Sequence, residues 1–247
     1  MEIFYLANWI WIFVGIITFI VLVAFNIRAP YGRHTAPGWG KLIPNHWGWF
    51  WMELPAFLAC PLLAIFGPAE KSMASWVLIG LWVFHYAHRT LIFPFKLRTK
   101  GKKMPISIVL SAIFFNVING FFNGFYLGFI GLQSVNALIF SGGVALFFIG
   151  FGINYTADQK LIALRRTSEG YQIPQGWLFR WISCPNHMGE IIEWVGFALA
   201  AFSLPGVSFA VWTFANLAPR AFNHHTWYKE NFTEYPASRK ALIPYLI

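Results

Sequence analysis

Three glutamates lie within apolar stretches of this sequence, where a carboxyl group needs a polar partner. They are Glu53, Glu190 and Glu193. A charge at the centre of a bilayer costs roughly 3 kcal/mol on insertion scales, so acidic groups there are usually functional. Possible partners lie in other apolar stretches: Tyr86, Arg89, Arg220, His224 and Tyr228. The pattern predicts a membrane bundle with a polar, reactive interior.

The segment around Glu53 reads Met52-Glu-Leu-Pro55, and Tyr86 lies within His85-Tyr-Ala-His-Arg89. Proline lacks an N–H and can kink a helix, so we expect an irregular turn beside Glu53. A tyrosine hydroxyl next to a buried carboxyl can donate a hydrogen bond to a carbonyl oxygen and stabilise enolate charge. The two residues are therefore a candidate carbonyl-binding pair. The alternative is that Tyr86 only satisfies the Glu53 carboxyl.

Polar residues with helical spacing gather at the ends of three further apolar stretches. The groups are Asn154, Asp158 and Arg165; Asn186, Glu190 and Glu193; and Arg220, His224 and Tyr228. Together they can line a pocket for a large anionic cofactor, because bases bind phosphates and the amides and carboxylates bind hydroxyl and amide groups. Each group alone is equally consistent with helix capping and snorkelling.

The composition predicts a membrane protein. Of 247 residues, 57% are hydrophobic and 11% are charged, whereas a soluble domain is about 25% charged. We expect an all-α bundle of seven transmembrane helices forming a single domain over residues 1–247. The expected spans are residues 4–26, 47–67, 74–95, 105–130, 134–155, 187–204 and 206–228.

The basic residues predict the orientation of the bundle. They follow the first, third and fifth spans, Arg98 and Lys100 among them, and occupy the tail, while the opposite loops hold only Lys71. The positive-inside rule then places the N-terminus outside and the C-terminus in the cytoplasm. We therefore attribute the net charge of +9 to topology and expect no nucleic-acid partner. Cys60 and Cys184 are expected to be buried free thiols.

The longest polar connection is expected over residues 156–186 and contains Tyr171-Gln-Ile-Pro-Gln-Gly176. The sequence has no P-loop and no G-x-G-x-x-G after a strand, so a nucleotide would bind within the bundle. His85 with His88, and His224 with His225, suggest a di-iron alternative. Such sites need about eight histidine ligands, and this chain has seven histidines, so we predict no metal site.

Most of the chain resembles the steroid 5α-reductase (3-oxo-5α-steroid 4-dehydrogenase) family, most closely its mammalian type 2 members and their bacterial relatives. The similar segments are Glu53-Leu-Pro55; His85-Tyr-Ala-His-Arg-Thr90; Gly152-Ile-Asn154 with Asp158; Ile173-Pro-Gln-Gly176 with Leu178-Phe179; Gly189-Glu-Ile-Ile-Glu-Trp194; Arg220-Ala-Phe222 with His224-His225; and Tyr235-Pro with Ser238-Arg-Lys-Ala-Leu-Ile-Pro244. The last two segments are the most specific.

The resemblance implies seven transmembrane helices, NADPH bound from the cytoplasmic side, and hydride transfer to the β-carbon of a Δ4-3-oxosteroid. It implies that Glu53 and Tyr86 hold the 3-oxo group. It assigns cofactor binding to Asn154, Asp158, Arg165, Tyr171, Asn186, Glu190, Arg220, His224 and Tyr228. The expected partners are a steroid or other lipid substrate and membrane lipids, and the expected state is a monomer.

Other interpretations stay open at this point. The same fold can reduce a polyprenol or an enoyl-thioester lipid. A transporter or lipid-binding bundle is the non-enzymatic alternative, although the inverted repeats typical of transporters are not apparent. The expected location is the inner membrane of a bacterium or the endoplasmic reticulum of a eukaryote. The sequence assigns no role to Glu193, His85, His88 or Arg89.

Overall fold

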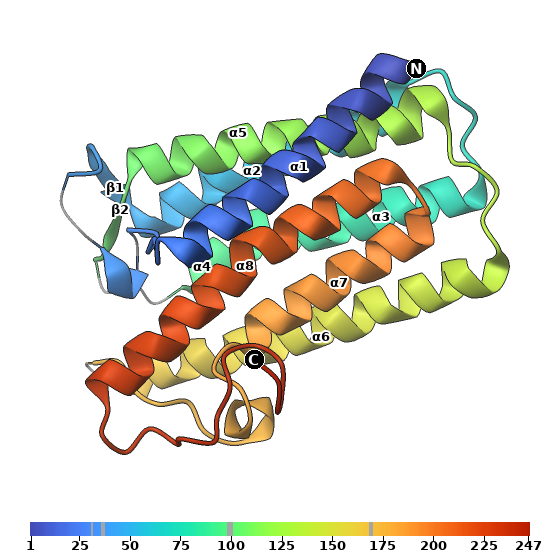
Figure 1. The fold of residues 1–247 in the computed structure, drawn as a ribbon. Coiled ribbons are helices and arrows are strands. Elements are labelled where there is room, and N and C mark those ends of the chain that lie inside the picture. Colours follow the sequence, from blue (N-terminus) through green and yellow to red (C-terminus); the bar gives the residue numbers. More distant parts are fainter. Residues whose placement is uncertain (31, 36–37, 98–100, 168–169) are drawn as a thin grey trace. The chain divides into compact units, whose positions relative to one another are not determined.

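The computed structural model describes residues 1–247 except residues 31, 36–37, 98–100 and 168–169 (Figure 1). Arg98 and Lys100, two of the loop residues used to predict the orientation, lie outside the described residues. The described chain is mostly helical and divides into two compact units. The first unit comprises Met1–Arg28, Leu138–Leu199 and Val207–Ile247, and the second comprises Ala29–Ala137 and Ala200–Gly206.

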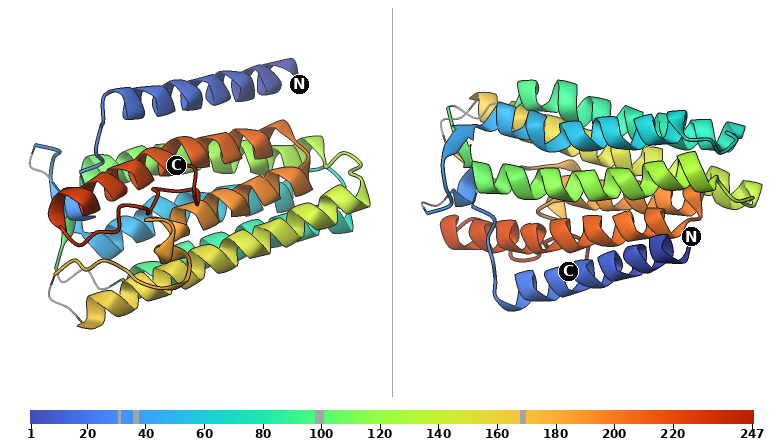
Figure 2. Two further views of the ribbon diagram at one scale, coloured as in Figure 1. Left: turned by 60° about the horizontal axis from the view of Figure 1, so that its bottom comes forward. Right: turned by 90° about the horizontal axis from the view of Figure 1, so that it is seen from above.

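The first unit contains α1 and most of α6, α7 and α8, together with a short 3-10 helix, η4 (Figures 1 and 2). Their bounds are Glu2–Ala24 for α1, Ala137–Thr167 for α6, Pro185–Ala201 for α7, Leu204–Asn231 for α8 and Trp177–Arg180 for η4. Helix α1 packs on α8, because the Trp212 ring lies 3.1 Å from a Cβ built on Gly15 and the Trp212 indole N–H donates to the Trp11 carbonyl at 2.8 Å.

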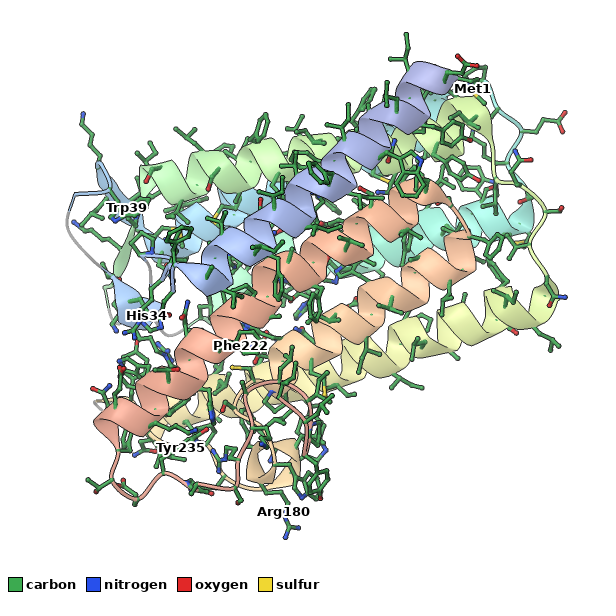
Figure 3. All side chains as sticks on the ribbon, viewed as in Figure 1. Met1, His34, Trp39, Arg180, Phe222 and Tyr235 are labelled. Atoms are coloured by element: carbon green, nitrogen blue, oxygen red, sulfur yellow. The ribbon has the colours of Figure 1, made fainter. Side chains whose placement is uncertain are left out.

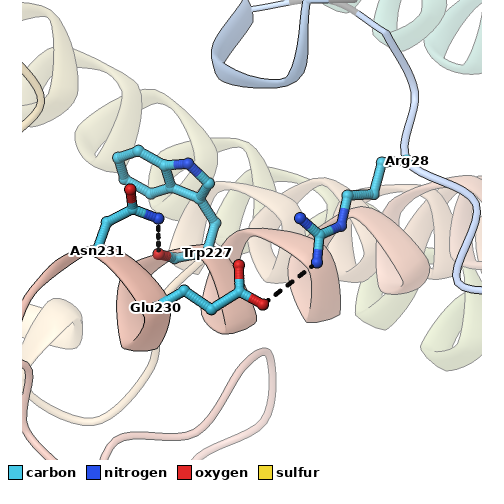
Figure 4. A network of polar contacts seen from close by, with 4 residues as sticks. All are labelled: Arg28, Trp227, Glu230 and Asn231. Carbon is cyan, nitrogen blue, oxygen red and sulfur yellow. Dashed lines mark hydrogen bonds and ion pairs between the residues drawn. The ribbon is translucent and has the colours of Figure 1, made fainter.

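The end of α1 is also tied to α8 by polar contacts. Asn223 donates to the Ile27 carbonyl at 3.1 Å. Arg28 and Glu230 form an ion pair at 3.4 Å (Figure 4), and both side chains are about one third to one half exposed. An exposed pair of this kind contributes at most about 1 kcal/mol. The aromatic contacts and the Asn223 bond therefore carry most of this attachment.

The second unit contains the remaining helices and a two-stranded antiparallel sheet, in which Leu42 pairs with Pro105. The elements are η1 (Gly32–His34), β1 (Leu42–Pro44), α2 (Asn45–Phe66), α3 (Met73–Ala87), the π-helix η2 (His88–Ile92), α4 (Phe93–Lys96), β2 (Lys103–Pro105), α5 (Ile106–Phe125) and the π-helix η3 (Tyr126–Ile130). The two strands were not predicted. They form where Pro44 and Pro105, both in extended conformation, precede α2 and α5, as the fixed φ of proline favours.

Helices α2 and α5 meet with their backbones in contact. A Cβ built on Gly124 would lie 2.7 Å from the Cys60 carbonyl oxygen, and one built on Gly128 would lie 2.8 Å from the Leu63 carbonyl carbon. Small residues that let backbones approach in this way are typical of helix contacts in membranes. Gly124 of α5 and Gly128 of η3 therefore fix the distance of this helical segment from α2, the helix that carries Glu53.

Four helices are long and apolar enough to cross a membrane: Glu2–Ala24, Asn45–Phe66, Ile106–Ile130 and Ala137–Thr167. They coincide with four of the seven predicted spans. Helices also occupy the other three stretches, but α3 and α7 are shorter, and the third stretch is divided by η2. The mostly helical membrane fold is therefore confirmed, whereas the count of seven spans stays a prediction.

The helix that contains the fifth predicted span is longer than that span, because α6 continues past residue 155 to Thr167. Ala157, Asp158 and Ile162 are buried in this extension, while Lys160 and Arg166 are exposed. This helical amphipathicity stabilises the last turns of α6 although the hydropathy falls there. Much of the connection expected over residues 156–186 is therefore helix, which gives Asp158 and Arg165 fixed positions on α6.

Candidate functional site

Glu53 of α2 and Tyr86 of α3 are linked through an amide on α5. The Asn116 side chain donates through Nδ2 to Glu53 Oε2 at 3.3 Å and to the Met52 carbonyl at 2.6 Å. The Tyr86 hydroxyl donates to Asn116 Oδ1 at 3.5 Å. Tyr86 and Asn116 are both buried. Three helices thus bring together an acid, a phenol and an amide in an apolar setting.

Two side chains bind the backbone of α2 near Pro55. Asn116 binds the Met52 carbonyl, and the Trp82 indole N–H donates to the Ala56 carbonyl at 2.8 Å. Helix α2 extends through Pro55, and the irregular turn expected beside Glu53 stays a prediction. The Trp82 ring also packs against the Tyr86 ring, with centroids 5.0 Å apart. Trp82 therefore positions Tyr86 relative to α2.

The other polar residues of the His85–Arg89 segment are buried as well. The Arg89 guanidinium lies 4.4 Å from the centre of the Phe93 ring and 5.1 Å from that of Trp49. Such cation–π contacts are worth about 2 kcal/mol when they are desolvated. His88 begins the π-helix η2, a wider turn that often marks functional sites.

The amides and carboxylates of α6 and α7 form one cluster in the first unit. Asn154 donates through Nδ2 to Glu190 Oε2 at 3.2 Å and to the Asn186 carbonyl at 3.0 Å. Asn186 donates to Asp158 Oδ1 at 3.2 Å. The structure therefore brings together four of the six residues that the spacing of the sequence singled out on these two helices; the other two are Arg165 and Glu193.

Glycines allow this cluster to form. A Cβ built on Gly189 would lie 2.7 Å from the Gly150 carbonyl oxygen, and one built on Gly196 would lie 2.7 Å from the Gly143 carbonyl oxygen. Backbone contact between α6 and α7 at these positions places Asn154 and Asp158 opposite Asn186 and Glu190. Glu193 is fully buried on the same helix as Glu190.

The donor and acceptor inventory of this cluster fits a polar cofactor. Asn154 Oδ1 is buried and has no hydrogen-bond partner among the described residues. A buried acceptor left without a donor costs about 1–3 kcal/mol. A ligand N–H or hydroxyl satisfies this oxygen, and the adjacent carboxylates accept further ribose or amide groups.

An aromatic series connects three of the remaining expected cofactor residues: Arg165, Tyr171 and Tyr228. The Arg165 guanidinium lies 4.8 Å from the centre of the Tyr171 ring, which is 5.1 Å from the Trp227 ring. Trp227 contacts Tyr228, with ring centroids 5.4 Å apart. These contacts bring the end of α6, the following loop and the end of α8 together, although the residues are far apart in the sequence.

Four residues were not identified from the sequence as neighbours of the site. Two of them, Tyr235 and Arg239, belong to the C-terminal tail (residues 232–247), and the other two, Ser183 and His225, lie next to it. The Ser183 hydroxyl lies 2.6 Å from the Tyr235 hydroxyl and 2.7 Å from His225 Nδ1. Figure 3 labels Tyr235 in this tail. Burial raises the pKa of the Tyr235 phenol, an effect that the hydrogen bond from Ser183 and the nearby Arg239 charge only partly offset.

Arg239 holds the tail in place. Its side chain is almost fully buried, donates to the Pro174 carbonyl at 3.2 Å, and lies 5.0 Å from the centre of the Tyr235 ring. The Tyr235 ring stacks on that of Tyr228 at 5.3 Å. The resemblance had marked the Tyr235–Pro244 motif as specific without giving it a role. It now has one, because the tail packs against an expected cofactor residue.

On α8, Arg220 and His224 are partly buried and Tyr228 is buried. The His224 ring lies 5.6 Å from the His187 ring of α7. All nine expected cofactor residues belong to the first unit, while Glu53 and Tyr86 belong to the second. Among the described residues, no three His, Cys, Asp or Glu side chains gather closely enough to hold a metal ion.

The fold and these two clusters define a class of protein. It is a helical membrane protein with a partly buried acid linked to a buried tyrosine in one unit and a polar, partly basic cluster of side chains in the other. The sequence profile of the 3-oxo-5-alpha-steroid 4-dehydrogenase family matches residues 102–247. The chain belongs to this family, whose members are oxidoreductases acting on CH–CH bonds.

Named relatives match over nearly the whole chain. The 3-oxo-5-alpha-steroid 4-dehydrogenase 1 of Bos taurus is 41% identical over 94% of this chain and 93% of its own length. The type 2 protein of Homo sapiens is 41% identical over 87% of each chain. The steroid 5-alpha-reductase DET2 of Gossypium hirsutum is 36% identical over 90% of each chain. The equal identities to type 1 and type 2 do not distinguish between these types.

Proposed function

We propose that this protein is an NADPH-dependent 3-oxosteroid 5α-reductase, which reduces the C4=C5 double bond of a 3-oxo-Δ4-steroid. The observation that carries the proposal is the linkage of the partly buried Glu53 to the buried Tyr86 through the buried Asn116 amide. An acid and a phenol held together by a neutral amide among apolar helices suit a ketone oxygen on an apolar substrate. The names of the relatives support the same activity.

Tyr86 donates a hydrogen bond to the 3-oxo oxygen and stabilises the negative charge that develops there. Neutral Glu53 donates from its second oxygen to the same atom, while Oε2 accepts from Asn116. NADPH, when bound, supplies the hydride that adds to C5 as the C4=C5 electron pair moves toward the 3-oxo oxygen, and C4 then takes up a proton. The apolar helices around the pair exclude water, which would weaken these hydrogen bonds.

The residues of the first unit hold the cofactor in this proposal. Arg165 and Arg220 bind phosphate groups. Asn154, Asp158, Asn186 and Glu190 bind hydroxyl and amide groups, and Tyr171, His224 and Tyr228 complete the set. The unsatisfied Asn154 Oδ1 supports this assignment.

The membrane arrangement follows the distribution of basic residues. We propose seven transmembrane spans in a single domain, with the N-terminus outside, the C-terminus in the cytoplasm, and a monomeric state. The four apolar helices support the membrane location. The stretches at α3 and α7, which are shorter, and at α8, which is long but less apolar, complete the count in this proposal.

The test is NADPH oxidation by purified protein in detergent or lipid with testosterone, progesterone, a polyprenol or an enoyl-CoA. We expect consumption of NADPH with a steroid only, and a product that is two hydrogens heavier and has the 5α configuration by mass spectrometry and chromatography. Consumption with the polyprenol or the thioester alone would instead identify a lipid reductase on the same fold.

A further inference from the structure

The amide of Asn116 touches both members of the proposed carbonyl pair, and neither the sequence motifs nor the family resemblance assigns it a role. It is buried on α5, a helix whose residues Ile106–Phe125 include no charged side chain. It lies between Glu53 of α2 and Tyr86 of α3. The geometry points to Asn116 as the positioning residue of the pair, an inference that rests on the proposed function.

The hydrogen bonds fix which way the amide faces. The Met52 carbonyl can only accept, so the side-chain atom 2.6 Å from it is the amide nitrogen Nδ2. An amide nitrogen has two hydrogens, and the second one reaches Glu53 Oε2. The amide oxygen then faces Tyr86, whose hydroxyl must donate to it. One side chain therefore sets the direction of the Tyr86 hydroxyl hydrogen and holds one carboxyl oxygen of Glu53 as an acceptor.

This arrangement prepares Tyr86 for a ketone. At 3.5 Å the bond from the Tyr86 hydroxyl to Asn116 is at the long limit for an O–H donor, so it is weak. A substrate carbonyl oxygen can replace Asn116 Oδ1 as the acceptor at little cost. The Tyr86 hydroxyl is then already oriented as a donor. The much shorter hydrogen bond to the Met52 carbonyl keeps the Asn116 side chain bound to the backbone of α2 while this exchange occurs.

A carboxyl in place of the amide separates this role from simple packing. Asn116→Asp keeps the size of the side chain but removes both N–H donors. Ionised, the new side chain repels or deprotonates Glu53; protonated, it again offers one donor. The titratable or charged groups on the packed elements are His46, Glu53 and Cys60 of α2, His85 and Tyr86 of α3, His88 and Arg89 of η2, Lys96 of α4, Lys103 of β2 and Tyr126 of η3.

The experiment compares wild type, Asn116→Asp, Asn116→Ala and Asn119→Ala in the full chain. Asn119 lies on the same helix, is equally buried, and donates to the Phe115 carbonyl of its own helix at 2.8 Å, so its variant controls for the loss of a buried amide. The measurements are kcat and KM for a 3-oxo-Δ4-steroid between about pH 6 and pH 8, NADPH affinity by tryptophan fluorescence, and thermal stability.

We expect Asn116→Ala to lower kcat at least about tenfold, with NADPH affinity within about twofold of wild type, whereas Asn119→Ala keeps the wild-type kcat. We expect kcat of Asn116→Asp to approach that of wild type as the pH falls. Wild-type kcat and an unchanged pH profile in both Asn116 variants would overturn the inference. The inference would also be overturned if the losses of kcat and of NADPH affinity across the variants were proportional to their losses of thermal stability. A folded wild type that binds NADPH but reduces no steroid would instead overturn the proposed function.

Discussion

Gly189 of α7 lies so close to Gly150 of α6 that a Cβ on Gly189 would stand 2.7 Å from the Gly150 carbonyl oxygen and 3.0 Å from the Asn154 Cα. An alanine at this position must push the two helices apart, because the atoms it meets belong to the backbone. The same contact positions Asn154, which binds Glu190 and Asn186. The polar cluster can therefore form only because residue 189 is a glycine without a Cβ.

Gly189→Ala should therefore destabilise the protein by about 1–3 kcal/mol and weaken NADPH binding. Thermal unfolding and a fluorescence titration measure the two effects. Gly152→Ala is the matched control, because a Cβ on this glycine of α6 meets no atom within 4 Å. Equal behaviour of the two variants would show that the backbone contact does not matter.

Glu53→Gln and Tyr86→Phe should each lower turnover of a 3-oxosteroid at least tenfold, which is a barrier change of roughly 1.4 kcal/mol. Tyr86→Phe removes the hydroxyl that donates to the substrate oxygen. Glu53→Gln replaces the acidic O–H donor by a much less acidic amide N–H. Both substitutions keep the shape of the side chain. Steady-state kinetics measure the loss, and NADPH affinity and folded yield should stay near wild type. Undiminished turnover in either variant would rule out the assigned role of that residue.

Wild-type protein should prefer NADPH to NADH at least tenfold in kcat/KM, because a 2′-phosphate adds about two charges that basic side chains can bind. Arg220→Ala should weaken both cofactors, since we assign this residue to the pyrophosphate that they share. Efficiencies measured with each cofactor in both proteins test the two statements. Equal efficiency with NADH in wild type would show that the basic residues serve topology alone.

Removing the Tyr235 hydroxyl should cost about 1 kcal/mol of stability, because Tyr235→Phe breaks the bond to Ser183. The raised pKa of Tyr235 adds a pH effect. Above about pH 10 the unfolded phenol ionises while the folded one keeps its proton. Stability contributed by this group is therefore complete below that pH and is lost as the pH rises toward the folded pKa.

Thermal unfolding at neutral and at alkaline pH measures both parts of this prediction. Tyr235→Phe should lose less stability than wild type on going to alkaline pH. Tyr245→Phe is the control, because Tyr245 lies in the same tail but is 80% exposed. The same alkaline loss in Tyr235→Phe as in wild type would contradict the assignment.

A reporter enzyme that is active only outside the cytoplasm should be silent when fused after Ile247. The basic residues that follow the odd-numbered predicted spans and fill the tail favour the cytoplasmic side. A fusion in the loop that contains Lys71 should be active and serves as the control. Strong activity of the C-terminal fusion would reverse the proposed orientation.

Hydropathy and helical spacing predicted much of the fold and of the polar cluster. Asn154 with Asp158, and Asn186 with Glu190, share helix faces because they are four residues apart, and the structure brings the two pairs into contact. Hydropathy failed at the end of α6, where an amphipathic extension is stabilised by burial of Ile162 rather than by uniform apolarity.

Asn116 could not be recognised from the sequence. It is one of three asparagines on α5, with Asn119 and Asn123, and all three are buried. Asn116 differs from the other two asparagines in its hydrogen-bond partners on α2 and α3. These partners depend on how α2 and α3 pack against α5. The same holds for Arg239, since its contacts to Pro174 and Tyr235 join segments that no local pattern relates.

The pairing of the tail with the segment before α7 has a consequence for biosynthesis. Ile182 and Lys240 form a parallel bridge, Ser183 donates to the Lys240 carbonyl, and Cys184 donates to the Ala241 carbonyl. Residues just before α7 are therefore held by residues synthesised almost sixty positions later. The ribosome must have passed residue 241 before Tyr228, Tyr235 and the segment before α7 can adopt their final arrangement, so the first unit completes its folding only after all of α8 has been synthesised.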